Sequence, residues 1–448
     1  MAIFDDEATR PAAYRRFERE TPQWYQDAKL GIFTHWGPYS VPAWAEPIGP
    51  LGTFDSVYWM THNPYAEWYY NTSKIDGSPA QQHQQEVYGG ADYDAFIDQW
   101  QAEKFDADAF MTVVAATGAR YFVPTTKHHD GVTLWDAPGT GERNTVRRGP
   151  HRDLVQEFHD AALRQGIRFG VYYSGGLDWW FSGLSPITGE IGEDLRPNDK
   201  AYADYAFDQT LDLIERYQPS VLWGDIDWPD AGKEPGDKSL IELFDRYYAA
   251  VPDGVVNDRF GTTHWDFKTS EYEAGRSAEG ERMWENTRGI GFSFGHNQLE
   301  DESNSLDGSG VIKHFVDVVS RGGNLLLNIG PTAAGEITEI QRRTLAGLGA
   351  WNTAHGDGIF GSRTLPVEIA RPSDEPWVRW TRSGDRAHAF VDLSGGSVTL
   401  DLEPDRLDIA DATAGTGAEL QVKDGRVRVD AVGEVVPAGP AHLSFRLR

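Results

Sequence analysis

Carboxylates stand where an apolar strand pattern ends, in the stretch from Pro219 to Pro229. Because side chains alternate along a strand, Val221, Trp223 and Asp225 are expected on one face. A carboxylate at the end of a buried strand is costly unless it is paired or functional. We interpret Asp225 as a candidate nucleophile beside an indole suited to stacking a sugar. The alternative is that Asp225 caps the following helix or pairs with an arginine.

Cleavage of a glycosidic bond is one chemistry that such carboxylates serve. In a retaining enzyme one carboxylate attacks the anomeric carbon and a second carboxyl group protonates the leaving oxygen, the two lying roughly 5–5.5 Å apart. Sequence spacing does not choose the pair, because the two groups meet only in the folded chain. The candidates at predicted strand ends are Asp225, Asp227, Glu271, Glu285 and Glu67.

Histidines form a second group of candidates: His128 and His129 are adjacent, and His35 ends another predicted strand. Neighbouring residues on a strand point to opposite faces, so we expect His128 and His129 to diverge. No metal-binding spacing accompanies them, and no phosphate-binding, dinucleotide or serine-elbow motif is present, so we predict neither metal nor cofactor. Neutral imidazoles that hydrogen-bond substrate hydroxyls fit better. The alternative is that a given histidine is simply a satisfied core residue.

The elements that must position these residues alternate between apolar strands and helices over most of the chain. Near-continuous apolar strands between helices indicate a parallel sheet covered on both faces. The number of units favours an α/β fold with a (β/α)8-like barrel, whose strands carry catalytic groups at their carboxyl ends. Residues 72–91, rich in Ser, Gln, Gly and Asp, are predicted to form an exposed loop.

After Gly358 the pattern changes to short, mostly alternating runs separated by Gly and Asp. Such runs predict a C-terminal antiparallel β-sandwich. The chain of 448 residues also exceeds the usual size of a single hydrophobic core. We therefore predict two domains, a catalytic barrel over residues 1–357 and a β-sandwich over residues 358–448.

Amino-acid composition limits the classes of binding partner and the cellular location that we expect. The net charge of −28, from 41 basic and 69 acidic side chains, argues against nucleic acid and anionic membranes, which are bound through positive charge. No apolar run approaches the roughly 20 residues that span a bilayer. The acidic amino terminus lacks the features of a signal peptide, so we expect a cytoplasmic protein. Zero cysteines exclude disulfides and cysteine nucleophiles. A homo-oligomer is left open.

A series of motifs, in order along the chain, resembles that of the α-L-fucosidases of glycoside hydrolase family 29. The motifs are Gly31–Gly37, Thr126–Gly131, Gly170–Ser174, Leu222–Asp225, Trp284–Gly289 and Gly323–Pro331. The resemblance implies a retaining exo-glycosidase with a catalytic barrel and a C-terminal β-sandwich. Its expected substrate is a small molecule or an oligosaccharide with a terminal L-fucose.

The same resemblance implies roles for individual residues. Asp225 matches the nucleophile and Glu271 the general acid/base, with Glu67 and Glu285 as the other candidates for the proton donor. The residues that match the fucose-binding set are His35, Glu67, Trp68, His128, His129, Tyr172, Trp223 and Arg259.

The implied roles make demands on the surroundings of the two acids. Asp225 must be held ionised, by Arg259 or a histidine, while Glu271 must stay protonated, which asks for a drier site. Close relatives often have Asn-Asp-Met-Gly where this chain has Gly-Asp-Ile-Asp, so Asp227 is an additional acid. Its charge would either raise the pKa of a neighbour or face solvent.

Three other functions stay open at this point. The first is an α-L-galactosidase or related L-sugar glycosidase with the same mechanism, since an apolar pocket rejects an added hydroxyl only about 10²-fold. The second is a non-catalytic sugar-binding protein that uses the same aromatic and histidine side chains. The third, and most distant, is a metal-dependent hydrolase.

Overall fold

The computed structural model describes residues 10–50, 52–272, 282–423, 426–432 and 439–448. Within them, a sheet of eight parallel strands runs in the order β5-β4-β3-β2-β1-β8-β7-β6. The strands are β1 (Leu30–Thr34), β2 (Tyr121–Lys127), β3 (Arg168–Ser174), β4 (Val221–Asp225), β5 (Val255–Val256), β6 (Lys268–Glu271), β7 (Trp284–Gly289) and β8 (Asn324–Ile329).

The two edge strands of this sheet meet and close it into a barrel. Asn257, just after β5, forms a parallel bridge with Phe267, just before β6. The backbone N–H of Asp266 also donates to the carbonyl of Val256 at 2.8 Å. Every residue of β1, β2, β4 and β8 is buried, as expected of strands covered on both faces. The predicted (β/α)8-like barrel is confirmed.

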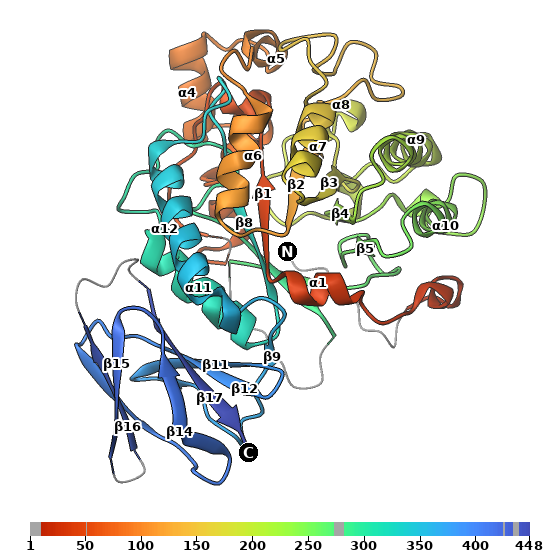
Figure 1. The fold of residues 1–448 in the computed structure, drawn as a ribbon. Helices are drawn as coiled ribbons and strands as arrows, with labels where there is room; N and C mark the ends of the chain where they lie inside the picture. The colour runs from red at the N-terminus through yellow and green to blue at the C-terminus, as the bar shows by residue number, and fades with distance from the viewer. Residues whose placement is uncertain (1–9, 51, 273–281, 424–425, 433–438) are drawn as a thin grey trace.

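Helices surround the strands on the outside of the barrel (Figure 1). The longer ones are α6 (Ala107–Ala116), α7 (Leu154–Arg164), α9 (Lys200–Tyr217), α10 (Leu240–Ala250), α11 (Gly308–Ser320) and α12 (Glu339–His355). Each begins after an Asp, Ser or Thr whose side chain accepts a hydrogen bond from a backbone N–H of the first turn. Such caps satisfy donors that the helix itself leaves unpaired.

The connection from β1 to β2 is long and carries part of the site. It holds α2 (Ser56–Thr61), the 3-10 helix η4 (Ala66–Trp68), α3 (Tyr69–Thr72), α4 (Pro79–Tyr88) and α5 (Asp94–Gln99). The predicted exposed loop over residues 72–91 is wrong, because α4 lies within it. Ser78 caps this helix, Pro79 occupies its first turn and Gly89 ends it at φ 61°. The stretch was predicted as a loop from its polar composition, although the serine, proline and glycine are typical residues for the start and the end of a helix.

The remaining short helices join these units. They are η2 (Ala12–Phe17), α1 (Gln23–Ala28), η3 (Pro38–Ser40), α8 (Trp179–Ser182), η5 (Glu193–Leu195), η6 (Asp230–Gly232) and η7 (Gly356–Gly358). No helix in the described ranges combines the length and the apolar character needed to cross a membrane.

Two antiparallel sheets follow the barrel. One contains β9 (Arg363–Thr364), β10 (Ser373–Asp374), β11 (Trp377–Ser383), β12 (Arg386–Val391), β14 (Leu407–Ala414) and β17 (Ala441–Leu447). The other contains β13 (Ser397–Asp401), β15 (Ala418–Lys423) and β16 (Arg426–Ala431). Apolar side chains from both sheets share one core, with Trp380 and Phe445 from the first and Leu400 and Val427 from the second. The predicted sandwich is confirmed, while the boundary at 357/358 stays a prediction.

The sandwich packs against α11 and α12 on the outside of the barrel (Figure 1). Arg379 of β11 forms an ion pair with Asp317 of α11. The indole of Trp351, in α12, donates to the carbonyl of Pro440 at 3.0 Å. These contacts hold the sandwich on helices that follow β7 and β8.

Candidate active site

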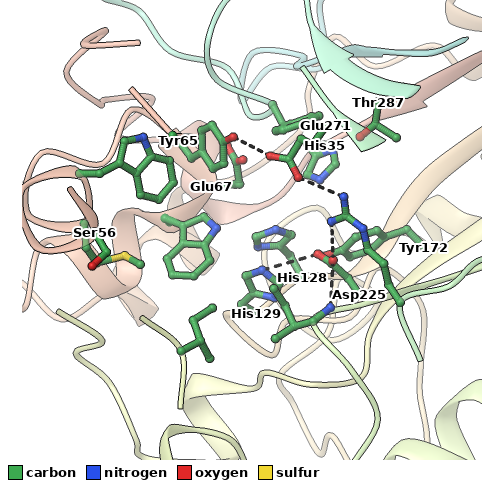
Figure 2. Close-up of a pocket in the computed structure, with 18 of the residues that line it drawn as sticks. His35, Ser56, Tyr65, Glu67, His128, His129, Tyr172, Asp225, Glu271 and Thr287 are labelled. Atoms are coloured by element: carbon green, nitrogen blue, oxygen red, sulfur yellow. Dashed lines mark hydrogen bonds and ion pairs between the residues drawn. The ribbon is translucent and has the colours of Figure 1, made fainter. Parts of the chain in front are cut away.

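A cavity of about 400 Å³ opens at the carboxyl ends of the barrel strands and is lined by every predicted site residue (Figure 2). Strands β3, β4 and β6 provide Tyr172, Trp223, Asp225 and Glu271, and η4 provides Glu67 and Trp68. The remaining residues follow strand ends: His35 directly after β1, His128 and His129 directly after β2, and Arg259 three residues after β5. Geometry thus brings the whole predicted set together, while the role of each residue stays a proposal.

Asp225 ends β4 and is surrounded by hydrogen-bond donors. Its carboxylate accepts from the Tyr172 hydroxyl at 2.7 Å, from Arg259 Nη1 at 3.0 Å and from the Ile226 N–H at 2.9 Å. Burial opposes its ionisation, but the Arg259 charge and the hydrogen bonds from Tyr172 and Arg259 together leave the pKa of Asp225 below its ordinary value. Asp225 is therefore held as a carboxylate.

The turn after Asp225 is strained. Ile226, a β-branched residue, has φ 67°, and Asp227 has φ 138°. A Cβ at Gly176 would lie within 3 Å of the Ile226–Asp227 backbone, so the neighbouring loop approaches as closely as glycine permits. This conformation aims the Ile226 N–H at the Asp225 carboxylate. Strain of this kind is concentrated at functional sites.

Glu271 ends β6 and shares Arg259 with Asp225. Arg259 Nη2 lies 3.1 Å from Glu271 Oε2, while Nη1 of the same group binds Asp225. The Tyr65 hydroxyl donates to Glu271 Oε1 at 2.6 Å. The side chain of Glu271 is 18% exposed and lines the cavity.

The adjacent histidines do not diverge, and that prediction is wrong. Both follow the end of β2 at Lys127, so strand alternation no longer applies to them. The ring centroids of His128 and His129 lie 4.0 Å apart, and both rings line the cavity. No group of three or more His, Asp or Glu in the described part of the chain is arranged to hold a metal ion.

Hydrogen bonds and burial set the state of these imidazoles. The Ser174 hydroxyl donates to the carbonyl of Leu177 at 2.8 Å, so it accepts from His129 Nδ1 at 2.6 Å. His129 Nε2 then lies 3.8 Å from Asp225 Oδ2. Burial lowers the pKa of His129 to about 3, and burial lowers the pKa of His128 as well. Both rings are neutral near pH 7.

His35 is neutral for the same reason. Its Nδ1 lies 2.7 Å from the side-chain oxygen of Asn328, whose amide nitrogen donates to the carbonyl of Phe294. Nδ1 is therefore the donor, which leaves Nε2 as an acceptor. Burial lowers the pKa of His35 to about 4. A neutral ring of this kind suits a sugar hydroxyl.

Glu67 and Trp68 form the wall contributed by η4. Glu67 Oε2 accepts from the Gly295 N–H at 2.7 Å and from the Ser293 hydroxyl at 3.2 Å. Burial raises the pKa of Glu67 to about 7, although these hydrogen bonds work in the other direction. The Trp68 ring meets that of His129 edge-on, with centroids 5.3 Å apart.

Trp223 forms the floor of the cavity and links it to the barrel interior. Its ring stacks on Tyr172 with centroids 5.5 Å apart, and Arg259 lies over its face. Its Nε1 donates to Glu285 at 2.9 Å. Glu285 is completely buried and also accepts from Tyr25 and Tyr121, both at 2.6 Å.

Two predictions about acids are corrected by these positions. Glu285 is absent from the cavity lining because its strand places it in the barrel core beneath Trp223, so it is not a proton donor to substrate. Burial, Glu234 and Asp227 together raise the pKa of Tyr14, as expected of an additional acid, but Asp227 does not face solvent. It is buried between Arg196 at 2.7 Å and Lys233 at 2.8 Å, which neutralise its charge.

Several residues of the cavity were not identified from the sequence. Tyr65 binds Glu271, and Phe294 lies against both Tyr65 and His35. The other side chains missed are Phe33, Phe54, Ser56, Trp59, Met60, Glu190, Ile191, Ile226 and Thr287. Phe54, Glu190, Ile191 and Ile226 belong to irregular connections, where periodicity carries no information. A signal was present for some of them: Phe33, Ile226 and Thr287 lie within the stretches named above, and Tyr65 lies two residues before Glu67.

Comparison with known proteins agrees with this geometry. A sequence model of the family described as Alpha-L-fucosidase matches residues 5–357. The tissue alpha-L-fucosidase of Homo sapiens is 30% identical over 379 residues, which cover 83% of this chain and 76% of that protein.

Solved structures extend the likeness over nearly the whole chain. A structure described as alpha-L-fucosidase is 39% identical, with a TM-score of 0.86 and coverage of 98% of this chain and 99% of that one. The Thermotoga maritima alpha-fucosidase in complex with fucose is 38% identical, with a TM-score of 0.81 and coverage of 95% and 97%. The chain therefore belongs to the α-L-fucosidase family of glycoside hydrolases.

Proposed function

We propose that this chain hydrolyses terminal α-L-fucosides with retention of configuration, through a covalent bond between the sugar and Asp225. The observation that carries the proposal is the pairing of Asp225 and Glu271 with the two terminal nitrogens of one guanidinium. Two hydrogen bonds and the width of that group limit their separation. Both acids are thereby held beside a single anomeric centre, while the retaining course of the reaction is what the resemblance to the α-L-fucosidases implies.

In the first step an oxygen of Asp225 attacks the anomeric carbon. The bond from that carbon to the leaving oxygen breaks, and Glu271 gives its proton to that oxygen. An ester between the sugar and Asp225 forms. The Tyr172 and Arg259 contacts orient the attacking carboxylate and compensate for its burial.

In the second step water attacks the same carbon, and Glu271 accepts a proton from it. The ester bond breaks and Asp225 returns as a carboxylate. A bound substrate covers the exposed edge of Glu271, which supplies the dry surroundings that protonation requires. Glu271 therefore acts first as acid and then as base.

The rest of the cavity holds the sugar. The neutral rings of His35, His128 and His129 offer nitrogens to the ring hydroxyls. Glu67 and Arg259 add an acceptor and a donor, while aromatic faces suit the methyl group of a 6-deoxy sugar. We propose L-fucose over L-galactose on this basis. The cytoplasmic location and the oligomeric state stay predictions.

The deciding experiment replaces the nucleophile. Asp225→Gly is expected to fold, to lose turnover of an aryl α-L-fucoside, and to recover part of it with azide, which attacks in place of the missing carboxylate. NMR of the first anomer released by the unmodified enzyme reports the stereochemistry. Unimpaired turnover by the variant, or release of the inverted anomer, would refute the proposal. Rates on aryl α-L-galactoside and α-L-fucoside compare the two sugars.

A further inference from the structure

We infer that the cavity contains a second subsite, for the leaving group, formed by residues 54–60 and 189–191, which accepts an uncharged group with an apolar face. The inference rests on the proposed function, because it concerns the group released when the glycosidic bond breaks. The two segments come from the long β1–β2 connection and from the loop after α8. None of their residues belongs to the predicted sugar-binding set.

The direction of the reaction places the leaving group on this side of the cavity. In the displacement, the nucleophile and the leaving oxygen lie on opposite sides of the anomeric carbon. Figure 2 shows Asp225 and Tyr172 at one side of the cavity, Ser56 at the other, and Glu271 and Tyr65 between them. A group whose oxygen takes the proton of Glu271 must therefore extend toward Ser56 and its neighbours.

Apolar side chains dominate this outer part of the cavity. The lining residues of the two segments include Phe54, Trp59, Met60 and Ile191. Phe54 is 43% exposed, as is Tyr58, and their ring centroids lie 5.0 Å apart. Large aromatic rings left in water beside a cavity mark a surface that gains from being covered. Their flat faces suit an aryl ring or the C–H face of a sugar.

The charges around the subsite disfavour an anionic group. Among the described residues that line the cavity, Arg259 is the only Lys or Arg. Both of its terminal nitrogens already bind carboxylates. The outer part carries instead the exposed carboxylate of Glu190. A leaving group with its own negative charge would meet repulsion and find no cation to pair with it.

The test compares two substrates with the same sugar and different leaving groups. The leaving atom of α-L-fucosyl fluoride is too small to reach the subsite, whereas 4-nitrophenyl α-L-fucoside fills it. We expect Phe54→Ala and Ile191→Ala each to lower the ratio of kcat/KM for the aryl fucoside to that for the fluoride by about 5- to 10-fold. Val87→Ala is the matched control, because Val87 lies on α4, is 59% exposed and does not line the cavity.

The outcomes separate this inference from the function on which it rests. A ratio that falls in the Phe54 and Ile191 variants but not in the Val87 variant supports the subsite. A ratio unchanged within twofold in all three overturns the subsite and leaves the proposed function intact. If the unmodified enzyme hydrolyses neither substrate, the proposed function fails, and the inference fails with it.

A second comparison tests the preference for uncharged groups. We expect Glu190→Gln to raise kcat/KM for 4-carboxyphenyl α-L-fucoside about 3-fold, because one repulsive charge is removed. The same variant should leave kcat/KM for the 4-nitrophenyl substrate within twofold of the unmodified enzyme. Equal effects on both substrates would overturn the electrostatic part of the inference.

Discussion

Asp225 and Glu271 are joined through a single guanidinium group, that of Arg259, which binds one carboxylate with each terminal nitrogen. The third nitrogen donates to the Thr269 hydroxyl at 3.0 Å, and the group lies over the Trp223 ring. Arg259 is therefore fixed from several sides. It sets the relative position of the two acids before any substrate arrives.

Replacing this guanidinium tests how far the reaction depends on it. Arg259→Lys keeps the positive charge but removes the planar fork, so it can bind only one of the two carboxylates at a time. We expect kcat/KM for an aryl α-L-fucoside to fall roughly 10²-fold. Steady-state kinetics measures the loss, and thermal unfolding checks that the variant is folded. A loss of less than threefold would contradict the arrangement proposed for the two acids.

Tyr65 should matter most when the leaving group needs a proton. Its hydroxyl donates to Glu271 at 2.6 Å, and Tyr65→Phe removes this contact alone. We expect about a 10-fold loss of kcat/KM on substrates with poor leaving groups and a smaller loss on activated aryl fucosides. A series of aryl fucosides measures the difference.

The control for Tyr65 is a neighbouring tyrosine. The Tyr272 ring stacks on that of Tyr65, but its hydroxyl donates to the carbonyl of Phe292. Tyr272→Phe should therefore show no dependence on the leaving group. Equal losses across the series in the Tyr65 variant would mean that Tyr65 acts on something other than proton transfer.

Glu285 is expected to support Trp223 and not to transfer protons. Both of its oxygens accept hydrogen bonds, from Trp223, Tyr25 and Tyr121, so Glu285→Leu leaves the buried Trp223 N–H without its acceptor. An unsatisfied buried donor costs about 1–3 kcal/mol, which should appear in the free energy of unfolding. Without Glu285 the Trp223 ring is no longer held in place at the floor of the cavity, so KM should rise.

Kinetics distinguishes this role from that of a proton donor. If Glu285 were the acid, its replacement would abolish turnover of substrates with poor leaving groups and spare activated ones. We expect instead a similar effect on both classes, because Trp223 binds the sugar that they share. A selective loss on poor leaving groups would return Glu285 to the candidates for acid/base.

Burial of Glu67 predicts how stability depends on pH. Its pKa is about 7 in the folded state, against 4.5 for an ordinary glutamate. Between these values the folded state keeps a proton that the unfolded state has released, so the free energy of unfolding falls as pH rises from 4.5 to about 7. Above about 7 this contribution no longer changes.

Urea unfolding at several pH values measures the effect. Glu67→Gln removes the titration but keeps the acceptor for Gly295, so its stability should fall less than that of the unmodified protein across this window. Glu86→Gln, on the exposed side of α4, is the matched control for loss of one carboxylate. Parallel curves for the Glu67 variant and the unmodified protein would show that Glu67 does not titrate in this range.

Local patterns in the sequence were enough to predict the barrel strands and the sandwich. Apolar runs such as that of β8 identify buried parallel strands, because a strand covered on both faces admits no polar alternation. The place of Asp225 at the end of such a run follows from the same local rule. Polar helices such as α4 were not predicted, because the residues that indicate them are at the helix ends and their apolar residues show no clear periodicity.

Other features of the site depend on residues far apart in the chain. Glu285 was a candidate for catalysis until the structure placed it beneath Trp223, and Asp227 until it was paired with Arg196. The bridge through Arg259 joins two strand ends, and the outer subsite joins α2 and the residues before it to the loop after α8.

The sequence by itself determined which residue types stand at the strand ends and that they belong to one family of motifs. Only the tertiary structure decided which acid faces the cavity, which one is buried and which cation holds each of them. The physical reason is that side-chain alternation is a local property of the backbone. Pairing between charges depends on distances in space, which neighbouring residues in the chain do not encode.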